Sequence, residues 1–154
     1  MARRFPLQPL LDLAHNHSED AGRRLQLLKV SWQEAEHKLA QLVSYREEYR
    51  SRLMQSSQQG MQMAAWREFQ MFMSKLDQAI ALQGDEVAKC RMRWEGGRLE
   101  WLERQRRLKA YGTLSQRHAA GEVKREAKSE QREQDEFAGR NESSRKPGDE
   151  PPHQ

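Results

Sequence analysis

Apolar residues recur along the first third of the chain at alternating spacings of four and three. Starting from Leu7, fourteen positions follow this rule as far as Leu53, and only Ser18 and Arg46 among them are polar. Such spacings place side chains on one face of an α-helix, and their strict alternation is the heptad pattern of a coiled coil. The pattern predicts one long helix with a narrow apolar stripe.

The same rhythm restarts at Trp66 and continues to Tyr111. Between the two stripes lies QSSQQG, residues 55–60, which is polar and ends in glycine, as expected where a helix reverses. We therefore expect a helix over about 8–55, a bend at 56–60 and a second helix over about 61–137. Folding the chain back at the bend sets mostly small residues opposite large ones. The expected neighbours are Ala21 with Gly97, Ser18 with Trp101, Ala14 with Arg104, and Leu25 with Trp94.

The composition agrees with helices rather than with a globular core. The 154 residues are enough for one domain, but only 36% are hydrophobic and 32% are charged. Such a chain is either disordered or built from long helices with one apolar stripe. No proline lies between residues 10 and 146, which permits long helices. We predict an all-α protein, a long antiparallel two-helix coiled-coil hairpin forming a single domain over 1–140, followed by a disordered tail over 141–154.

Basic charge gathers in the second helix. The isoelectric point is about 9.4, and residues 89–109 contain eight basic side chains against three acidic ones. This favours an acidic partner, either a protein or a nucleic acid. Trp94 and Trp101 are interleaved with the basic residues, but both belong to the apolar stripe, where their faces would be covered. We therefore favour an acidic protein partner over a nucleic acid.

No pattern of catalytic, metal-binding or cofactor-binding residues is present. Cys90 is the single cysteine, which excludes an internal disulfide and a cysteine-based zinc site. His15 and His17 are two residues apart and point to different faces of a helix. Gly96 and Gly97 follow no strand and precede no Gly-Lys-Ser/Thr phosphate loop. No signal peptide and no run of 18 apolar residues is recognisable. We expect a protein without enzymatic activity, cofactor or metal.

Near the predicted bend the apolar stripe is wider than two helices can cover. A two-stranded stripe uses about two residues in seven. Here Tyr45, Phe72 and Ala79 are additional, and they border three stripe residues, Leu42, Tyr49 and Leu76. Either the extra side chains pack over the edge of the stripe, or they form a docking surface for another protein.

Five segments of the chain, together with their order and spacing, carry a resemblance to a known family. The sequence resembles the FliJ family, small components of the bacterial flagellar type III export apparatus that serve motility and chemotaxis. The resemblance implies a hairpin similar to the central stalk of rotary ATP synthases. The segments are LLDLA (10–14), QEAEHKLAQLVSYREEYRSRL (33–53), WREFQMFMSKLDQAI (66–80), WLERQRRLKAYGTLSQRH (101–118) and EQDEFA (133–138).

The resemblance also implies partners. These are the hexameric ring of the export ATPase FliI, whose assembly and activity the protein would promote as an axle, and the cytoplasmic domain of the export gate FlhA. A chaperone-like escort role, with other export chaperones as partners, would accompany them. The location implied is the cytoplasm, peripheral to the inner membrane through the export apparatus. A generic scaffolding or nucleic-acid-binding coiled coil is the alternative.

Two sets of binding residues follow from the resemblance. The set for the export gate consists of Leu42, Tyr45, Tyr49, Phe72, Leu76 and Ala79, flanked by Lys38 and Gln83. The set for the ATPase ring consists of Leu7, Leu11, Arg104, Arg107 and Tyr111.

Overall fold

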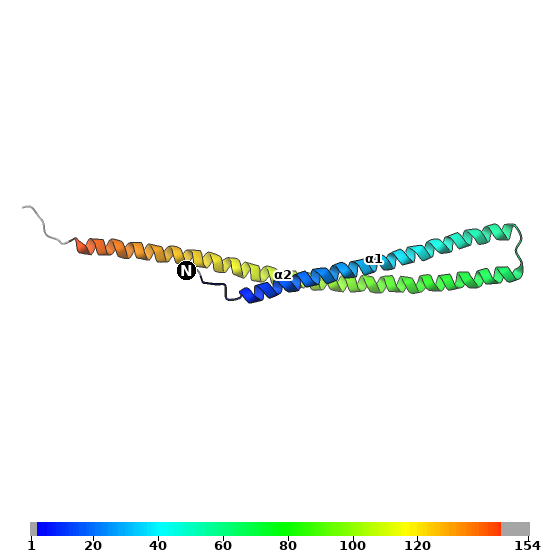
Figure 1. The fold of residues 1–154 in the computed structure, drawn as a ribbon, viewed down its shortest axis with the longest axis horizontal. Helices are drawn as coiled ribbons and strands as arrows, with labels where there is room; N and C mark the ends of the chain where they lie inside the picture. Colours follow the sequence, from blue (N-terminus) through cyan, green and yellow to red (C-terminus); the bar gives the residue numbers. More distant parts are fainter. Residues whose placement is uncertain (1–2, 146–154) are drawn as a thin grey trace, which may run out of the picture. The chain divides into compact units, whose positions relative to one another are not determined.

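Two long helices make up the protein. A computed structural model describes residues 3–145, with α1 over Gln8–Gln58 and α2 over Met63–Ser144 (Figure 1). Within these described residues there is no strand. The prediction of an all-α protein whose two helices pack against each other is confirmed.

The chain divides into two compact units. Unit 1 contains Met1–Ala14 together with Leu108–Gln154, and unit 2 contains His15–Arg107. In each unit a stretch of α1 packs against a stretch of α2, and unit 2 also holds the connection between the helices.

In unit 2 the helices pack along the predicted stripes. Ala21 and Ala35 of α1 are buried, as are Leu76 and Cys90 of α2. The other stripe positions of this unit are buried or half-buried, except Trp66, which is 37% exposed. Two helices in contact share one line of side chains, which explains why so few residues are buried outright.

The two stripes meet about one helical turn away from the predicted register. Trp101 was expected beside Ser18, but its Nε1 atom lies 3.4 Å from the position that a Cβ would take at Gly22. Ser18 is instead beside Gln105, whose Nε2 donates a hydrogen bond of 2.7 Å to the Ser18 Oγ. Trp94 also lies beside Trp32, with 5.2 Å between ring centroids.

The position of the connection accounts for this shift. α1 continues to Gln58 and α2 begins at Met63, so the reversal occupies residues 59–62 rather than 56–60. Moving a reversal by about two residues moves the facing residue by about four, which is one helical turn. Ser57 still belongs to α1, and its Oγ donates a hydrogen bond of 2.9 Å to the Met54 carbonyl. The chain turns at Gly60, whose φ of 85° is readily adopted only by glycine.

In unit 1 the packing continues past Tyr111, where the sequence predicted almost no stripe. The Phe5 ring lies 5.6 Å from the His118 ring, centroid to centroid. The Arg3 backbone N–H donates a hydrogen bond of 3.3 Å to Oε2 of Glu122, which is buried. The first residues of the chain are therefore fastened to α2 by an aromatic contact and a polar one.

Beyond Glu122 the described side chains of α2 are all exposed. The helix nevertheless runs to Ser144, seven residues past the predicted end at 137. Residues 141–144, which were predicted to belong to a disordered tail, are helical. No proline interrupts the chain before Pro147, so the helix can continue with its side chains exposed to solvent. Of the rest of that predicted tail, residues 146–154 lie outside the described residues.

Candidate partner-binding surface

Four aromatic side chains gather in unit 2 near the connection. Tyr49 is the centre of the group, with its ring centroid 4.6 Å from that of Phe72 and 5.0 Å from that of Tyr45. Phe69 lies 6.1 Å from Tyr49, and Tyr45 lies 6.2 Å from Phe72. Aromatic pairs at these separations attract one another beyond the area they bury. The cluster joins α1 to α2 through side chains from both helices.

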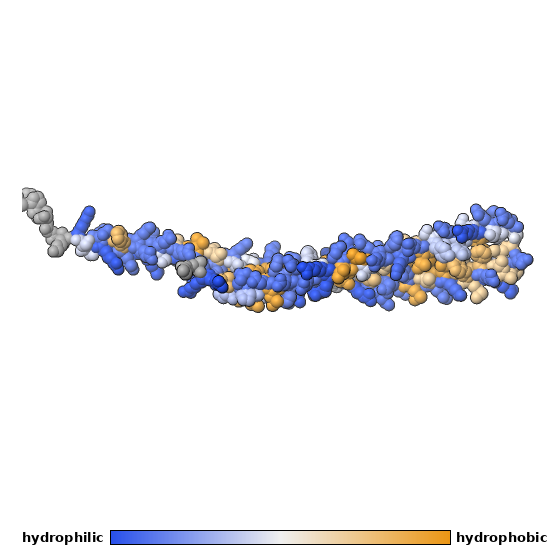
Figure 2. Space-filling model, viewed as in Figure 1, coloured by the Kyte–Doolittle hydropathy of each residue, from blue (hydrophilic) through white to orange (hydrophobic). Residues whose placement is uncertain are grey.

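Exposure is graded across the six residues predicted to bind the export gate. Leu76 is buried, with 7% exposed, whereas Tyr45 is 42% exposed. The other four, Leu42, Tyr49, Phe72 and Ala79, are half-buried. Apolar surface is visible over this end of unit 2 in Figure 2. The set is therefore partly the contact between the helices and partly exposed surface.

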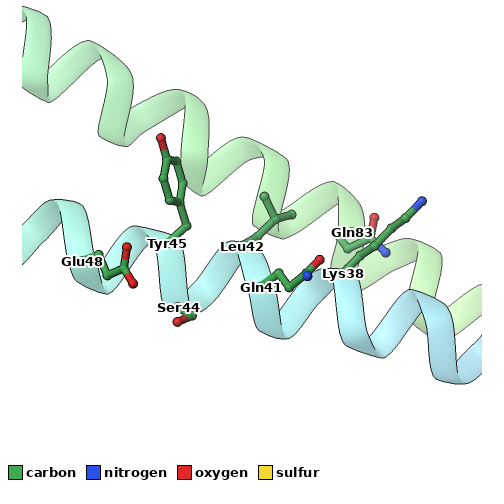
Figure 3. A pocket seen from close by; sticks show the side chains of 7 residues that line it. All are labelled: Lys38, Gln41, Leu42, Ser44, Tyr45, Glu48 and Gln83. Carbon is green, nitrogen blue, oxygen red and sulfur yellow. The ribbon is translucent and has the colours of Figure 1, made fainter.

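A shallow groove opens beside Tyr45. It has a volume of about 580 Å³, and six of its seven lining residues come from α1, with Gln83 contributed by α2 (Figure 3). Gln83 is held in place because its Nε2 donates a hydrogen bond of 2.9 Å to the Ala35 carbonyl. The lining residues are Lys38, Gln41, Leu42, Ser44, Tyr45, Glu48 and Gln83.

One ion pair and one shifted phenol pKa describe the electrostatics around the aromatic cluster. Arg46 forms an ion pair with Asp77 across the two helices, with Nε and Oδ1 2.5 Å apart. This partner raises the pKa of Arg46 further above its ordinary value, so the guanidinium is always charged. The neighbouring Tyr49 phenol, and after it burial, raise the pKa of the Tyr45 phenol above its ordinary value. Tyr45 is therefore a neutral, partly apolar group at physiological pH.

The structure brings most of the predicted gate-binding residues together and adds others. Tyr45 and Leu42 line the groove together with Lys38 and Gln83, which the resemblance placed at the flanks. Gln41, Ser44 and Glu48 also line the groove but were not in the predicted set. Gln41 and Glu48 are four and three residues from Tyr45, a spacing that places them on its face of the helix. Phe69 had been assigned only to the stripe.

The residues predicted to meet the ATPase ring fall in both units. In unit 1, Leu7 is 36% exposed, while Leu11 and Tyr111 are half-buried. In unit 2, an Arg104 Nη1 is 3.3 Å from Nδ1 of His17, and Arg107 is exposed with its Nε 3.5 Å from Oε1 of Glu103. These side chains contact helix neighbours as well as solvent.

Residues 3–145 contain no group of three or more His, Cys, Asp or Glu side chains that could hold a metal ion. Nor does either helix, over the same residues, have a stretch both long and apolar enough to cross a membrane.

Comparisons with known proteins agree with the resemblance seen in the sequence. The family model described as Flagellar FliJ protein matches residues 3–146. The flagellar FliJ protein of Salmonella typhi is 33% identical over 140 residues, which cover 91% of this chain and 95% of that protein. The flagellar FliJ protein of Escherichia coli K12 is 32% identical with the same coverage. The chain therefore belongs to the FliJ family, whose members are components of the flagellar export apparatus.

Proposed function

We propose that the protein is a non-enzymatic link of the export apparatus that docks on the cytoplasmic domain of the export gate FlhA through the surface around Tyr45. The observation that supports this most is the combination of a 42% exposed tyrosine with a groove of about 580 Å³ beside it. Tyrosines beside a concave surface are characteristic of binding hot spots, because they provide much contact area at a small entropic cost.

The groove has the composition of a protein-binding surface. Leu42 and Tyr45 provide its apolar part, while Lys38 and Glu48 provide charges of both signs. Apolar anchors surrounded by polar side chains are typical of such interfaces. The Tyr45 ring packs against the rings of Tyr49 and Phe72, so that it is already positioned before a partner binds.

Isothermal titration calorimetry with the purified cytoplasmic domain of FlhA tests this proposal. Tyr45→Ala is expected to weaken binding at least about fivefold, corresponding to about 1 kcal/mol or more, as truncation of a hot-spot residue does. Leu27→Ala is the matched control, since Leu27 is an apolar residue of α1 that is 68% exposed outside the groove. Equal affinities of the two variants would contradict the proposal.

We further propose that the protein acts as an axle for the export ATPase FliI and promotes its ring assembly and ATP hydrolysis. The contacts would come from the residues predicted to meet the ATPase ring. Leu7 and Leu11 of unit 1 are candidate apolar contacts, and Arg107 of unit 2 is a candidate basic one. A chaperone-like escort role and a peripheral location at the cytoplasmic face of the inner membrane belong to the same proposal.

The axle proposal is tested by mixing the purified protein with FliI and measuring hydrolysis and ring formation. Both are expected to rise, and Leu7→Glu is expected to reduce the stimulation without changing the helical content. If neither the hydrolysis rate nor the oligomeric state of FliI changes when the protein is added, the axle proposal is refuted.

The basic residues of α2 give the nucleic-acid alternative little support. Within unit 2, Arg91 is paired with Glu95 at 3.4 Å, and Arg107 with Glu103 at 3.5 Å. Such ion pairs lower the positive charge that a phosphate backbone would meet. Strong, salt-dependent binding to unrelated DNA would favour the alternative nevertheless.

A further inference from the structure

A second stripe of exposed residues runs along unit 2 on the side of α2 that faces away from α1. Met92 and Leu99 are its most prominent members, 72% and 66% exposed. Because seven residues make nearly two helical turns, positions seven apart lie on one face. We name this set the outer face: Ala81, Asp85, Ala88, Lys89, Met92, Gly96, Leu99, Glu103 and Arg106, all exposed.

The outer face is distinct from the contact with α1. Cys90, Trp94, Gly97 and Trp101 mark the side of α2 that is buried or half-buried against α1. At about 100° per residue, Met92 lies about half a turn away from this side. A helix that carries apolar side chains on each of two sides can pack against two helices, and within unit 2 α1 occupies only one of these sides.

Gly96, at the middle of the outer face, has no explanation within the chain. A Cβ at Gly97 would lie 2.6 Å from Cδ1 of Leu28, which accounts for that glycine. A Cβ at Gly96 would meet nothing within 4 Å. An exposed glycine inside a helix costs about 1 kcal/mol relative to alanine. What glycine does permit is the close approach of another backbone.

The order of charges along the outer face identifies the second backbone. Asp85 precedes Gly96 by about as many residues as Arg106 follows it. Lys89 and Glu103 likewise lie at equal separations before and after Gly96. Among the described residues, Asp85, Lys89 and Arg106 have no ion-pair partner. A helix with this order is complementary to an antiparallel copy of itself.

We propose that the outer face binds the same face of a second copy of this chain, antiparallel, about a two-fold axis close to Gly96. In this arrangement Met92 of each copy lies opposite Leu99 of the other. Asp85 lies opposite Arg106, and Lys89 lies next to Glu103. Because the interface is isologous, each contact occurs twice. A parallel copy would instead set Asp85 against Asp85 and Arg106 against Arg106.

The dimer is weak and depends on concentration. Each copy contributes one Met, one Leu and two Ala to the contact, much less apolar area than an obligate dimer buries. Exposed ion pairs add little free energy, so their effect is to select the antiparallel orientation. The face is also separate from the surface around Tyr45, so a dimer leaves the proposed gate-binding groove open.

Sedimentation equilibrium of the full chain, up to about 1 mM, tests the proposal in the range where weak dimers form. We expect a monomer–dimer equilibrium. Met92→Glu is expected to lower the association constant at least about tenfold, because a charge replaces a central apolar contact. Leu27→Glu, an equally exposed apolar position on α1, is the control and should leave the constant unchanged. Thermal melting monitored by circular dichroism verifies that each variant is folded.

A charge exchange tests the orientation. Asp85→Arg alone places two arginines opposite each other at both ends of the interface and should weaken association. Adding Arg106→Asp recreates both pairs with reversed signs and should restore the constant to within about threefold. A chain that stays monomeric throughout, a dimer insensitive to Met92→Glu, or a double variant no better than Asp85→Arg would each overturn the proposal.

Discussion

Gly97 and Gly96 are adjacent in α2, yet the same substitution should affect them in opposite directions. Replacing either by alanine removes the helix penalty of glycine, which is worth about 1 kcal/mol. At Gly96 nothing opposes this gain, because its Cβ position is open. We expect Gly96→Ala to raise the free energy of unfolding by about 0.5–1 kcal/mol.

At Gly97 the new methyl group would lie 2.6 Å from Cδ1 of Leu28 and 3.7 Å from Cδ1 of Leu25. Overpacking of a tight contact costs about 1–3 kcal/mol. Leu28 can rotate, so the cost is about 2 kcal/mol, which exceeds the gain in helix propensity. The net expectation for Gly97→Ala is a loss of about 1 kcal/mol.

Urea unfolding at a protein concentration low enough to keep the chain monomeric measures both variants. The cause is isolated by repeating Gly97→Ala in a chain that already carries Leu28→Ala. Without the leucine the clash is gone, and Gly97→Ala should become neutral or stabilising. If Gly97→Ala destabilises both backgrounds equally, Leu28 is not the reason for the glycine, and the proposed packing between the helices at this position is wrong.

Three further outcomes follow from contacts in the two units. Tyr49→Ala should lower both the melting temperature and the affinity for the FlhA cytoplasmic domain, because Tyr49 contacts Phe69 and Phe72 as well as the exposed Tyr45; a loss of affinity alone would mean that the cluster contributes nothing to folding. Glu122→Ala should accelerate amide hydrogen exchange at residues 3–7, since it removes the acceptor of the Arg3 N–H, whereas Lys124→Ala, at an exposed neighbouring position, should not. Cys90 is 6% exposed, so its thiol should react with Ellman's reagent only as fast as the helices separate; immediate reaction in the native state would exclude the buried position.

The stripe positions could be predicted from the sequence because a coiled-coil heptad determines which side chains of a helix face its partner. The register could not be predicted as accurately. It depends on where the chain reverses, and QSSQQG contains several residues suited to a turn. Ser57 and Gln58 remain in the helix, so α1 extends further than composition alone suggested.

The closure of unit 1 was missed for a different reason. Its contacts join Phe5 to His118 and the Arg3 backbone to Glu122, and neither His118 nor Glu122 is apolar. Hydrophobic periodicity detects apolar stripes, but it does not detect a backbone N–H that finds a carboxylate more than a hundred residues away. Phe5, three residues ahead of α1, was the one available signal.

Tyr45, Tyr49 and Phe72 illustrate how far the candidate site could be predicted. The sequence shows that there are more apolar residues here than a two-helix stripe uses. The groove beside Tyr45, in contrast, depends on Gln83 of α2, which is 38 residues from Tyr45 along the chain. Long-range proximity of that kind requires the register, which was the uncertain quantity.

The contact between α1 and α2 in unit 2 is a single line of side chains, and this has an evolutionary consequence. Among the described residues even the most buried, Ala21, keeps 2% of its surface exposed. A partner that touches Tyr49 or Phe72 therefore touches the residues that hold the helices together, with no intervening layer. Substitutions that adjust recognition there also alter folding, so the binding surface and the packing can change only together. Divergence between relatives should accordingly be slower along this line than on the outward sides of the same helices.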